Sequence, residues 1–304
     1  MTQVRRLRSA DDFAAHLAAV GADLGFDEVV APAPAGPLAA PTTFGRRAVG
    51  NRFAILPMEG WDGTDDGRPT DLVRRRWQRF GESGAKLVWG GEAVAVRPDG
   101  RANPHQLVID ERTAGDLAGL RVALVEAHDA AVGRTDDLVV GLQLTHSGRF
   151  ARPGADAVPR TAYEHPLLDG RVGAGAASVL SDGELDDLVG AFVAAAVLAH
   201  GAGFDFVDVK CCHGYLLHEL LSAHDRPGRY GGDLDGRTYF LTAVLQGVAA
   251  AAPGLGLGVR VSAFDVVPHR AGADERGEPE PTAGAAYRHA FGGDGTGTGS
   301  DLDE

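Results

Sequence analysis

The chain has 304 residues, of which 44% are hydrophobic and 23% are charged, a composition that excludes both wholesale disorder and a small disulfide-stapled fold. Its 42 acidic residues outnumber its 29 basic ones, giving a formal net charge of -13. That charge argues against a nucleic-acid or anionic-membrane binder, which would need a basic face, and makes a small-molecule substrate the expected partner.

Residues 1–50 are predicted to be a lead-in to the main domain. Their early arginines resemble those of a transit peptide, but Ser9 followed by Asp12 is typical of a helix N-cap with an acidic first turn. The segment lacks the apolar core of a secretory signal, and no apolar run in the chain approaches the roughly 20 residues that span a bilayer. We therefore expect a cytoplasmic protein without a membrane partner.

Short apolar runs alternate with amphipathic stretches over residues 51–264, which is typical of βα units around a parallel sheet. Each run is followed by polar or glycine-rich residues. Five strands are predicted, at residues 53–58, within the span 86–96, and at 138–145, 204–210 and 257–262.

Two amphipathic helices are predicted between these strands. Apolar residues recur at helical spacing over 72–80 and again over 185–196. Ser181 and Glu184 have the spacing of a capping box before the second helix, and Gly201 is a stop signal after it. Repeated units of this kind indicate either a doubly wound sheet or a TIM-type (βα)8 barrel.

Polar residues at the carboxyl ends of the strands favour the barrel, because all of these ends meet on its catalytic face. Only five units can be counted, without a sixth, seventh or eighth strand. The predicted fold is therefore an α/β, TIM-type barrel that is incomplete over 51–264, followed at 265–304 by a loop and a mobile, acidic, glycine-rich tail. The polar residues are Glu59, Glu92, Gln143, His146, Lys210, His213 and Arg260.

The densest cluster of reactive side chains holds Lys210, His213 and Tyr215, directly after an apolar strand. A cation, an imidazole and a phenol there could converge on one substrate atom. Each also has an ordinary structural explanation, as a solvated strand end, a helix cap and a core aromatic. Cys211 and Cys212 are adjacent, which disfavours a disulfide between them and suits a reducing compartment, and their spacing is not that of a zinc site.

Segments spread over residues 51–264 together resemble the old yellow enzyme family of FMN-dependent NAD(P)H ene-reductases and their 2,4-dienoyl-CoA reductase relatives. They occur in the family's order and at its spacing. The segments are Asn51-Arg52-Phe53 with Pro57-Met58, residues 92–96 (EAVAV), 141–149 (GLQLTHSGR), 213–219 (HGYLLHE) with 229–232 (RYGG) and 236–237 (GR), and 259–262 (VRVS).

This resemblance implies FMN as cofactor, NAD(P)H as co-substrate, and the residues that hold the flavin. In the family, the positions matching Pro57, Met58 and Ala93 pack against the isoalloxazine ring, and the glutamine matching Gln143 bonds its pyrimidine edge. The arginine matching Arg260 lies near N1 and O2, where a fixed positive charge stabilises the anionic reduced ring. The alternative for Arg260 is a cap on a strand end.

The resemblance also implies the catalytic residues. The family uses two donors three residues apart, here Lys210 and His213. Its tyrosine, matching Tyr215, protonates the α carbon after flavin N5 has delivered hydride to the β carbon. Lys210 departs from the usual histidine or asparagine and changes the donor set. Glu59 replaces the usual cysteine or threonine, and it either disfavours the reduced flavin or pairs with an arginine.

Three functions remain open from the sequence. The first is FMN-dependent reduction of the C=C bond of an α,β-unsaturated carbonyl or enoyl substrate, with the missing strands supplied by a longer chain, a complementing chain or a homo-oligomer. The second is a non-catalytic remnant that acts as a binding or regulatory partner. The third is an aldolase-like barrel with Lys210 as a Schiff-base nucleophile. Gln143, Arg260 and the pair Pro57-Met58 favour the first over the third.

Overall fold

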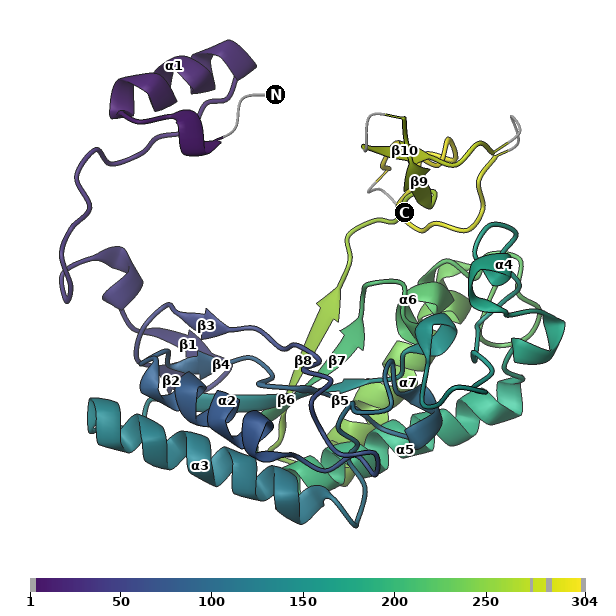
Figure 1. Ribbon diagram of the computed structural model, residues 1–304, viewed down its shortest axis with the longest axis horizontal. Helices are drawn as coiled ribbons and strands as arrows, with labels where there is room; N and C mark the ends of the chain where they lie inside the picture. The colour runs from purple at the N-terminus through teal and green to yellow at the C-terminus, as the bar shows by residue number, and fades with distance from the viewer. Residues whose placement is uncertain (1–3, 274–275, 283–285, 302–304) are drawn as a thin grey trace.

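A computed structural model describes residues 4–273, 276–282 and 286–301 of the chain. Its main body is a parallel sheet with long helices packed against it (Figure 1). The strand order is β3-β4-β6-β7-β8, and β5 pairs with β6. These strands are β3 (Ala54–Ile55), β4 (Leu87–Val88), β5 (Ala93–Ala95), β6 (Val139–Thr145), β7 (Phe206–Cys211) and β8 (Gly256–Val261).

All five predicted strand regions contain strands, but two differ from the prediction. Residues 86–96 form two short strands, β4 and β5, on either side of Gly90 and Gly91, and Gly91 has a positive φ of 34°. A glycine in that conformation interrupts an extended run. The predicted strand 53–58 is reduced to β3, because residues 56–63 leave the sheet as a loop.

The helices connect the strands in the predicted βα order. Ser181 and Glu184 form the predicted capping box, since each backbone N–H donates to the other side chain. The apolar faces of the helices pack on the sheet in one core that includes Trp77, Phe192 and Phe240. The helices are α2 (Asp71–Glu82), α3 (Ala114–Val132), α4 (Asp169–Val172), α5 (Asp182–Gly201), α6 (Leu216–Leu221) and α7 (Leu234–Ala251).

The sheet is open at both edges among the described residues, where β3 and β8 each pair with a single neighbour. Apolar side chains are exposed at both edges: Phe53 and Leu56 beside β3, and Val261 and Phe264 at β8, are each between 45% and 59% exposed. Because the strands are parallel, their carboxyl ends lie along one side of the sheet. The architecture is thus α/β with a parallel sheet.

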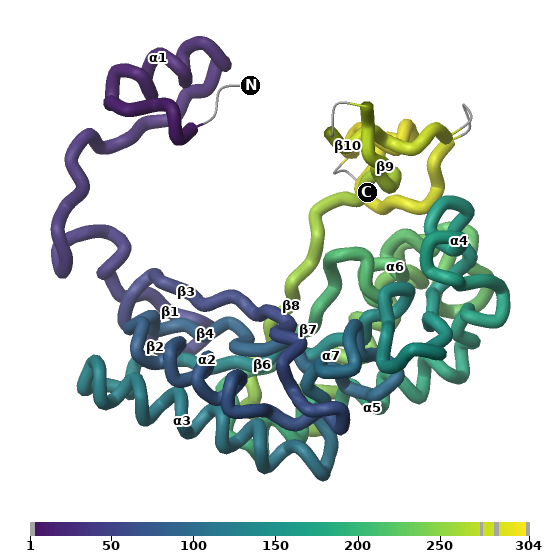
Figure 2. The backbone as a smooth tube through the Cα atoms, in the orientation of Figure 1, coloured from purple at the N-terminus to yellow at the C-terminus, as the bar shows by residue number. Residues whose placement is uncertain are grey.

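The N-terminal helix α1 (Ala10–Val20) lies apart from the sheet and is joined to it by an extended segment (Figure 2). Ser9 caps it as predicted, because its side chain accepts a hydrogen bond from the Asp12 backbone N–H. The hairpin of β1 (Thr42–Phe44) and β2 (Arg47–Val49) follows. None of the helices in the described part of the chain has the length and hydrophobicity of a membrane span.

The C-terminal segment 286–301 overlaps the glycine-rich tail expected from the sequence, and it makes backbone hydrogen bonds. Backbone hydrogen bonds join Tyr287 to Gly295 and Val267 to Gly297, so this glycine-rich segment folds back on itself and on the chain that leaves β8. Positive φ values at Gly295 and Gly297 allow those turns. The strands β9 (His269–Ala271) and β10 (Gly277–Pro279) form a separate hairpin, and residues 302–304 lie outside the described residues.

Candidate active site

One pocket of about 280 Å³ lies at the carboxyl ends of the strands, and all eight side chains to which the sequence assigned a site role line it. Glu59 and Trp61, from the loop after β3, complete its wall. The eight are Pro57, Met58, Ala93, Gln143, Lys210, His213, Tyr215 and Arg260.

The register of the parallel strands explains this convergence. Ala93 on β5 pairs with Gln143 on β6, and Lys210 on β7 pairs with Arg260 on β8. Paired residues of neighbouring strands project to the same face of a sheet. Side chains more than 150 positions apart in the sequence therefore meet beside one pocket.

Glu59 contacts two of the proposed catalytic side chains. Lys210 Nζ lies 2.6 Å from Glu59 Oε1, and the Tyr215 hydroxyl donates to Glu59 Oε2 at 2.8 Å. The Lys210 ammonium also lies 3.8 Å from the centroid of the Tyr215 ring, in cation–π contact. Glu59 does pair with a cation, but the expected arginine is wrong, since its partner is Lys210.

Burial sets the protonation states around this cluster. The Lys210 and Glu59 side chains are only 6% and 8% exposed, so each charge depends on the other for stabilisation. Burial raises the pKa of Tyr215, and the Glu59 carboxylate raises it further. Burial and the charges of Lys210 and Arg260 lower the pKa of His213, so its imidazole is neutral at pH 7.

Two residues of the pocket have a backbone conformation that bulky side chains rarely adopt. Trp61 has a φ of 52° and His213 a φ of 62°. Such conformations persist only where the surrounding structure enforces them, and they cluster at functional sites. Sequence reasoning missed Trp61 because a single tryptophan in a loop carries no pattern.

Glu92 and Arg76 hold the loop that carries Glu59 in place. Glu92 accepts hydrogen bonds from the Gly60 backbone at 2.8 Å and from Arg76 at 2.6 Å, and Arg76 also binds Asp62. Glu92 is thus an anchor of the loop and does not line the pocket. His146 follows the carboxyl end of β6, but it is 2% exposed and does not line the pocket either.

Gln143 and Arg260 leave hydrogen-bonding groups available to a ligand. Gln143 Nε2 donates to Asp208 Oδ2 at 2.5 Å. A carboxylate only accepts, so this contact fixes the amide orientation and leaves the Gln143 oxygen as an acceptor with no donor among the described residues. No hydrogen bond or ion pair within the described chain engages the Arg260 guanidinium. Asp208 was not assigned to the site from the sequence, although an aspartate within an apolar strand is unusual enough to indicate a special role.

These features fit an isoalloxazine ring. The ring needs an apolar wall, an acceptor for its N–H edge and a positive charge near its pyrimidine side. Met58, 51% exposed on the pocket wall, supplies apolar surface that a flat ring could cover. The Gln143 oxygen and the Arg260 guanidinium supply the other two.

The adjacent cysteines contribute no reactive thiol. Cys211 donates to the Leu217 carbonyl at 3.4 Å, and burial raises its pKa to about 12. Burial also raises the pKa of Cys212. Both therefore remain protonated at neutral pH. Over the described ranges, no group of three His, Cys, Asp or Glu side chains is placed to hold a metal ion.

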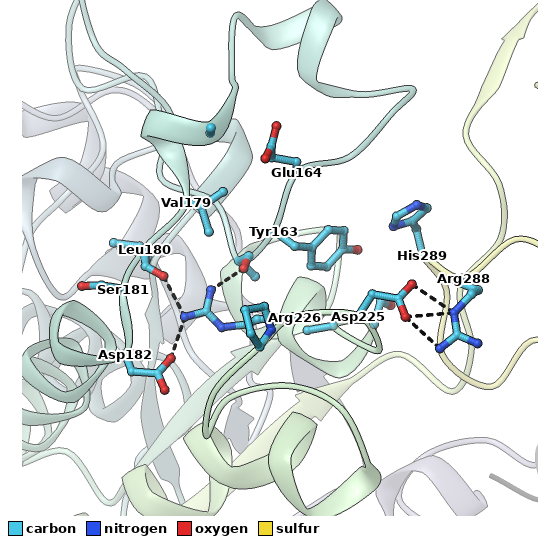
Figure 3. Close-up of a pocket in the computed structure, with 15 residues that line it drawn as sticks. Tyr163, Glu164, Val179, Leu180, Ser181, Asp182, Asp225, Arg226, Arg288 and His289 are labelled. Atoms are coloured by element: carbon cyan, nitrogen blue, oxygen red, sulfur yellow. Dashed lines mark hydrogen bonds and ion pairs between the residues drawn. The ribbon is translucent and has the colours of Figure 1, made fainter.

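A larger cavity of about 600 Å³ lies near the start of α5, and none of the predicted site residues lines it. Figure 3 shows that its cations are already engaged: Arg226 donates to the Leu180 carbonyl and to Asp182, and Arg288 pairs with Asp225. These contacts tie loops together. The smaller pocket is the better candidate for the site.

Comparison with known proteins finds a matching family model and related enzymes. The model of the NADH:flavin oxidoreductase / NADH oxidase family matches residues 37–285. The NADPH dehydrogenase of Bacillus cytotoxicus is 30% identical over 240 residues, which cover 76% of this chain and 63% of that protein. The NADPH dehydrogenase of Bacillus subtilis is 31% identical over 233 residues, 74% of this chain and 63% of that protein. The chain therefore spans about three fifths of the length of these relatives.

Solved structures share the fold. The Old Yellow Enzyme from Pichia sp. AKU4542 superposes with a TM-score of 0.60 at 22% identity, over 76% of this chain and 60% of that one. A 2-naphthoyl-CoA reductase gives a TM-score of 0.61 at 18% identity, over 74% of this chain and 35% of that one. At such identities the likeness concerns the arrangement of strands and helices alone.

Proposed function

Because the chain belongs to the NADH:flavin oxidoreductase / NADH oxidase family, which includes the old yellow enzymes, we propose that it binds FMN and reduces an activated alkene with NAD(P)H. The substrate class is an α,β-unsaturated carbonyl or enoyl compound. The observation that carries the proposal is the meeting of eight predicted side chains at one pocket.

The flavin side of the pocket would be built from five of these residues. Pro57, Met58 and Ala93 provide the wall for the ring, Gln143 offers its amide oxygen to an N–H donor, and Arg260 provides the positive charge. When bound, FMN would supply the hydride for the alkene. A fixed charge in a site that excludes water costs no reorganisation during the reaction, which is why such groups dominate many rate enhancements.

The substrate side would be built from Lys210, His213 and Tyr215. The ammonium and the neutral imidazole can each donate an N–H to a substrate oxygen and so polarise the conjugated alkene. Tyr215 keeps its proton at neutral pH because its pKa is raised, and it releases the proton only to a strongly basic carbon. The aldolase-like alternative is disfavoured, because an ammonium held 2.6 Å from Glu59 is a poor nucleophile.

We also infer that further strands cover β3 and β8 in the active protein. Exposed apolar side chains and unpaired edges invite pairing with additional chain, whether from a longer polypeptide, a complementing chain or a second copy. These same edges support the alternative function, a remnant that binds a relative without catalysis. The free thiols of Cys211 and Cys212 suit the reducing cytoplasm.

Titration with FMN tests the proposal. We expect the folded chain to retain FMN and become yellow, and Arg260→Met to weaken binding about tenfold, the loss of about 1.4 kcal/mol. Arg79→Met, on the exposed surface of α2, is the matched control and should bind as the wild type. A soluble, folded chain that retains no flavin would favour the remnant function.

The Tyr215→Phe variant tests the proton donor in the flavin-loaded protein. It should slow alkene reduction by about 10² to 10⁴ while flavin reduction by NAD(P)H is unchanged, because only the reduction of the alkene needs the hydroxyl proton. Stopped-flow absorbance separates the two half-reactions. Equal losses in both would remove Tyr215 from this role.

A further inference from the structure

Glu59 is the group of the pocket that neither the family pattern nor the proposed roles explain. It bridges Lys210 and Tyr215, and its carboxylate also accepts a hydrogen bond from the Trp61 indole at 3.3 Å. Glu92 and Arg76 fix the loop beneath it, so its position is enforced by the fold. A buried carboxylate with three donors in a substrate pocket has a definite electrostatic effect.

We propose that Glu59 determines the charge of the substrate that this site accepts. By pairing with Lys210, Glu59 makes the substrate side of the pocket electrically neutral. The site therefore accepts a substrate whose alkene is activated by a neutral group, such as an aldehyde, ketone, amide, ester or thioester. It rejects a free carboxylate. This inference rests on the proposed function and names its substrate class.

Lys210 is the buried cation of the substrate side of the pocket. A lone buried ammonium would be the natural partner of a substrate carboxylate. Here one of its N–H groups is taken by Glu59 at 2.6 Å, and its positive charge is balanced. The remaining N–H groups can still donate to a neutral carbonyl oxygen, because that interaction needs a donor and no net charge.

A substrate carboxylate at Lys210 would face Glu59 at short range. Like charges placed together in a partly buried site repel each other and disfavour binding of the ligand. The other groups around the cluster do not relieve this repulsion. His213 is neutral at pH 7, Tyr215 keeps its proton, and Arg260 is the positive charge assigned above to the flavin side of the pocket.

The decisive experiment compares two ligands of nearly equal shape, trans-cinnamamide and trans-cinnamate. Calorimetry on the FMN-treated wild-type chain should show cinnamamide binding at least about tenfold more tightly. In Glu59→Gln, cinnamate affinity should rise about 10- to 100-fold, because Lys210 then carries an unbalanced charge. Glu59→Asp keeps the charge and should keep the preference for the amide.

A second measurement needs neither flavin nor ligand. Ultraviolet titration of the chain, with Tyr215→Phe as the subtraction reference, should show Tyr215 ionising at lower pH in Glu59→Gln than in the wild type. This titration tests whether Glu59 places a negative charge beside Tyr215, and the ligand comparison tests what that charge does to the substrate. Matched cinnamate and cinnamamide affinities in the wild type, or an unchanged ratio in a folded Glu59→Gln, would overturn the inference.

Failure of the proposed function has a different signature. In that case the wild type retains no FMN, and the two ligands are compared on the flavin-free chain. The ratio of their affinities still decides the role of Glu59, whereas the missing flavin decides against the redox activity.

Discussion

Two buried lysine–carboxylate pairs with equal separations lie at opposite ends of the parallel strands. Lys86 Nζ is 2.6 Å from Asp137 Oδ1, and Lys210 Nζ is 2.6 Å from Glu59 Oε1. The side chains of the first pair are 6% and 9% exposed, and those of the second are 6% and 8% exposed. Neither distance nor burial distinguishes them.

The surroundings of the two pairs are different. Lys86 precedes β4 at the amino ends of the strands, where it also donates to the Arg134 carbonyl at 2.7 Å. Lys210 lies near the end of β7, beside Tyr215 and a pocket. In barrels the amino ends serve stability and the carboxyl ends serve function. A buried ion pair therefore acquires a chemical role from the other groups that it contacts, here a pocket and Tyr215.

Breaking the amino-end pair should give the largest effect. Asp137→Asn leaves Lys86 buried without a counter-charge, and we expect the free energy of unfolding to fall by about 3–5 kcal/mol. Urea denaturation at pH 7 measures the loss. FMN affinity should stay unchanged in the fraction that remains folded.

The matched variant of the carboxyl-end pair is Glu59→Gln. It should lose less than half as much stability, because the Lys210 ammonium borders the pocket and water can solvate it there. If Glu59→Gln lost more stability than Asp137→Asn, the Lys210 pair would mainly stabilise the fold, and the proposed difference between the two pairs would be wrong.

Much of this arrangement was predictable from local patterns. Alternating apolar runs and helical spacing gave the βα order, and Ser9 and Ser181 marked helix starts because capping is a short-range effect. Polar strand-end residues such as Gln143 and Arg260 were expected to meet because parallel strands with helical connections bring their carboxyl ends together. Pro57, Met58 and Ala93 were assigned to the site only through the family resemblance. The division at Gly90 and Gly91 was missed, since both parts of the segment remain apolar.

The contacts within the pocket were not predictable in the same way. Glu59 and Lys210 are 151 positions apart, and only the register of β7 and the loop after β3 decides that they meet. Asp208 and Gln143 are 65 positions apart and meet through the pairing of β6 with β7. Hydrogen-bonded anchors such as Glu92 and mobile-looking glycine segments such as 292–301 also depend on tertiary contacts.

A third buried pair lies on the carboxyl side of the sheet, like the Lys210 pair, but it is fully enclosed. Arg149 and Glu219 have side chains 0% and 5% exposed, and burial raises the pKa of Glu219 to about 7. Between the ordinary value near 4.5 and about 7, the folded chain holds a proton that the unfolded chain has lost. Stability should therefore fall as pH rises through that window, by up to about 3 kcal/mol.

Glu219→Gln should abolish this pH dependence, since an amide does not titrate. Urea midpoints at pH 5 and pH 7.5 measure the difference, and Glu126→Gln, on an exposed position of α3, is the control that keeps the wild-type slope. Parallel pH curves for Glu219→Gln and wild type would show that Arg149 keeps Glu219 ionised throughout. A side chain at the carboxyl side would then be tuned by pairing more than by burial.

The smallest expected effect separates two aspartates of a single strand region. Asp205, just before β7, accepts from the Val140 backbone at 2.8 Å and pairs with Arg47, whereas Asp208 within β7 orients Gln143. In Asp208→Asn the new amide can donate, so Gln143 is free to reverse and present its NH₂ to the ligand. FMN affinity should then fall about tenfold, or about 1.4 kcal/mol, in a fluorescence titration. Stability should barely change, because Asp208 Oδ1 has no partner and burial already raises the pKa of Asp208.

Asp205→Asn should show the reverse, lower stability with unchanged FMN affinity. If both variants lose the same property, position along the strand does not divide function from stability in this sheet.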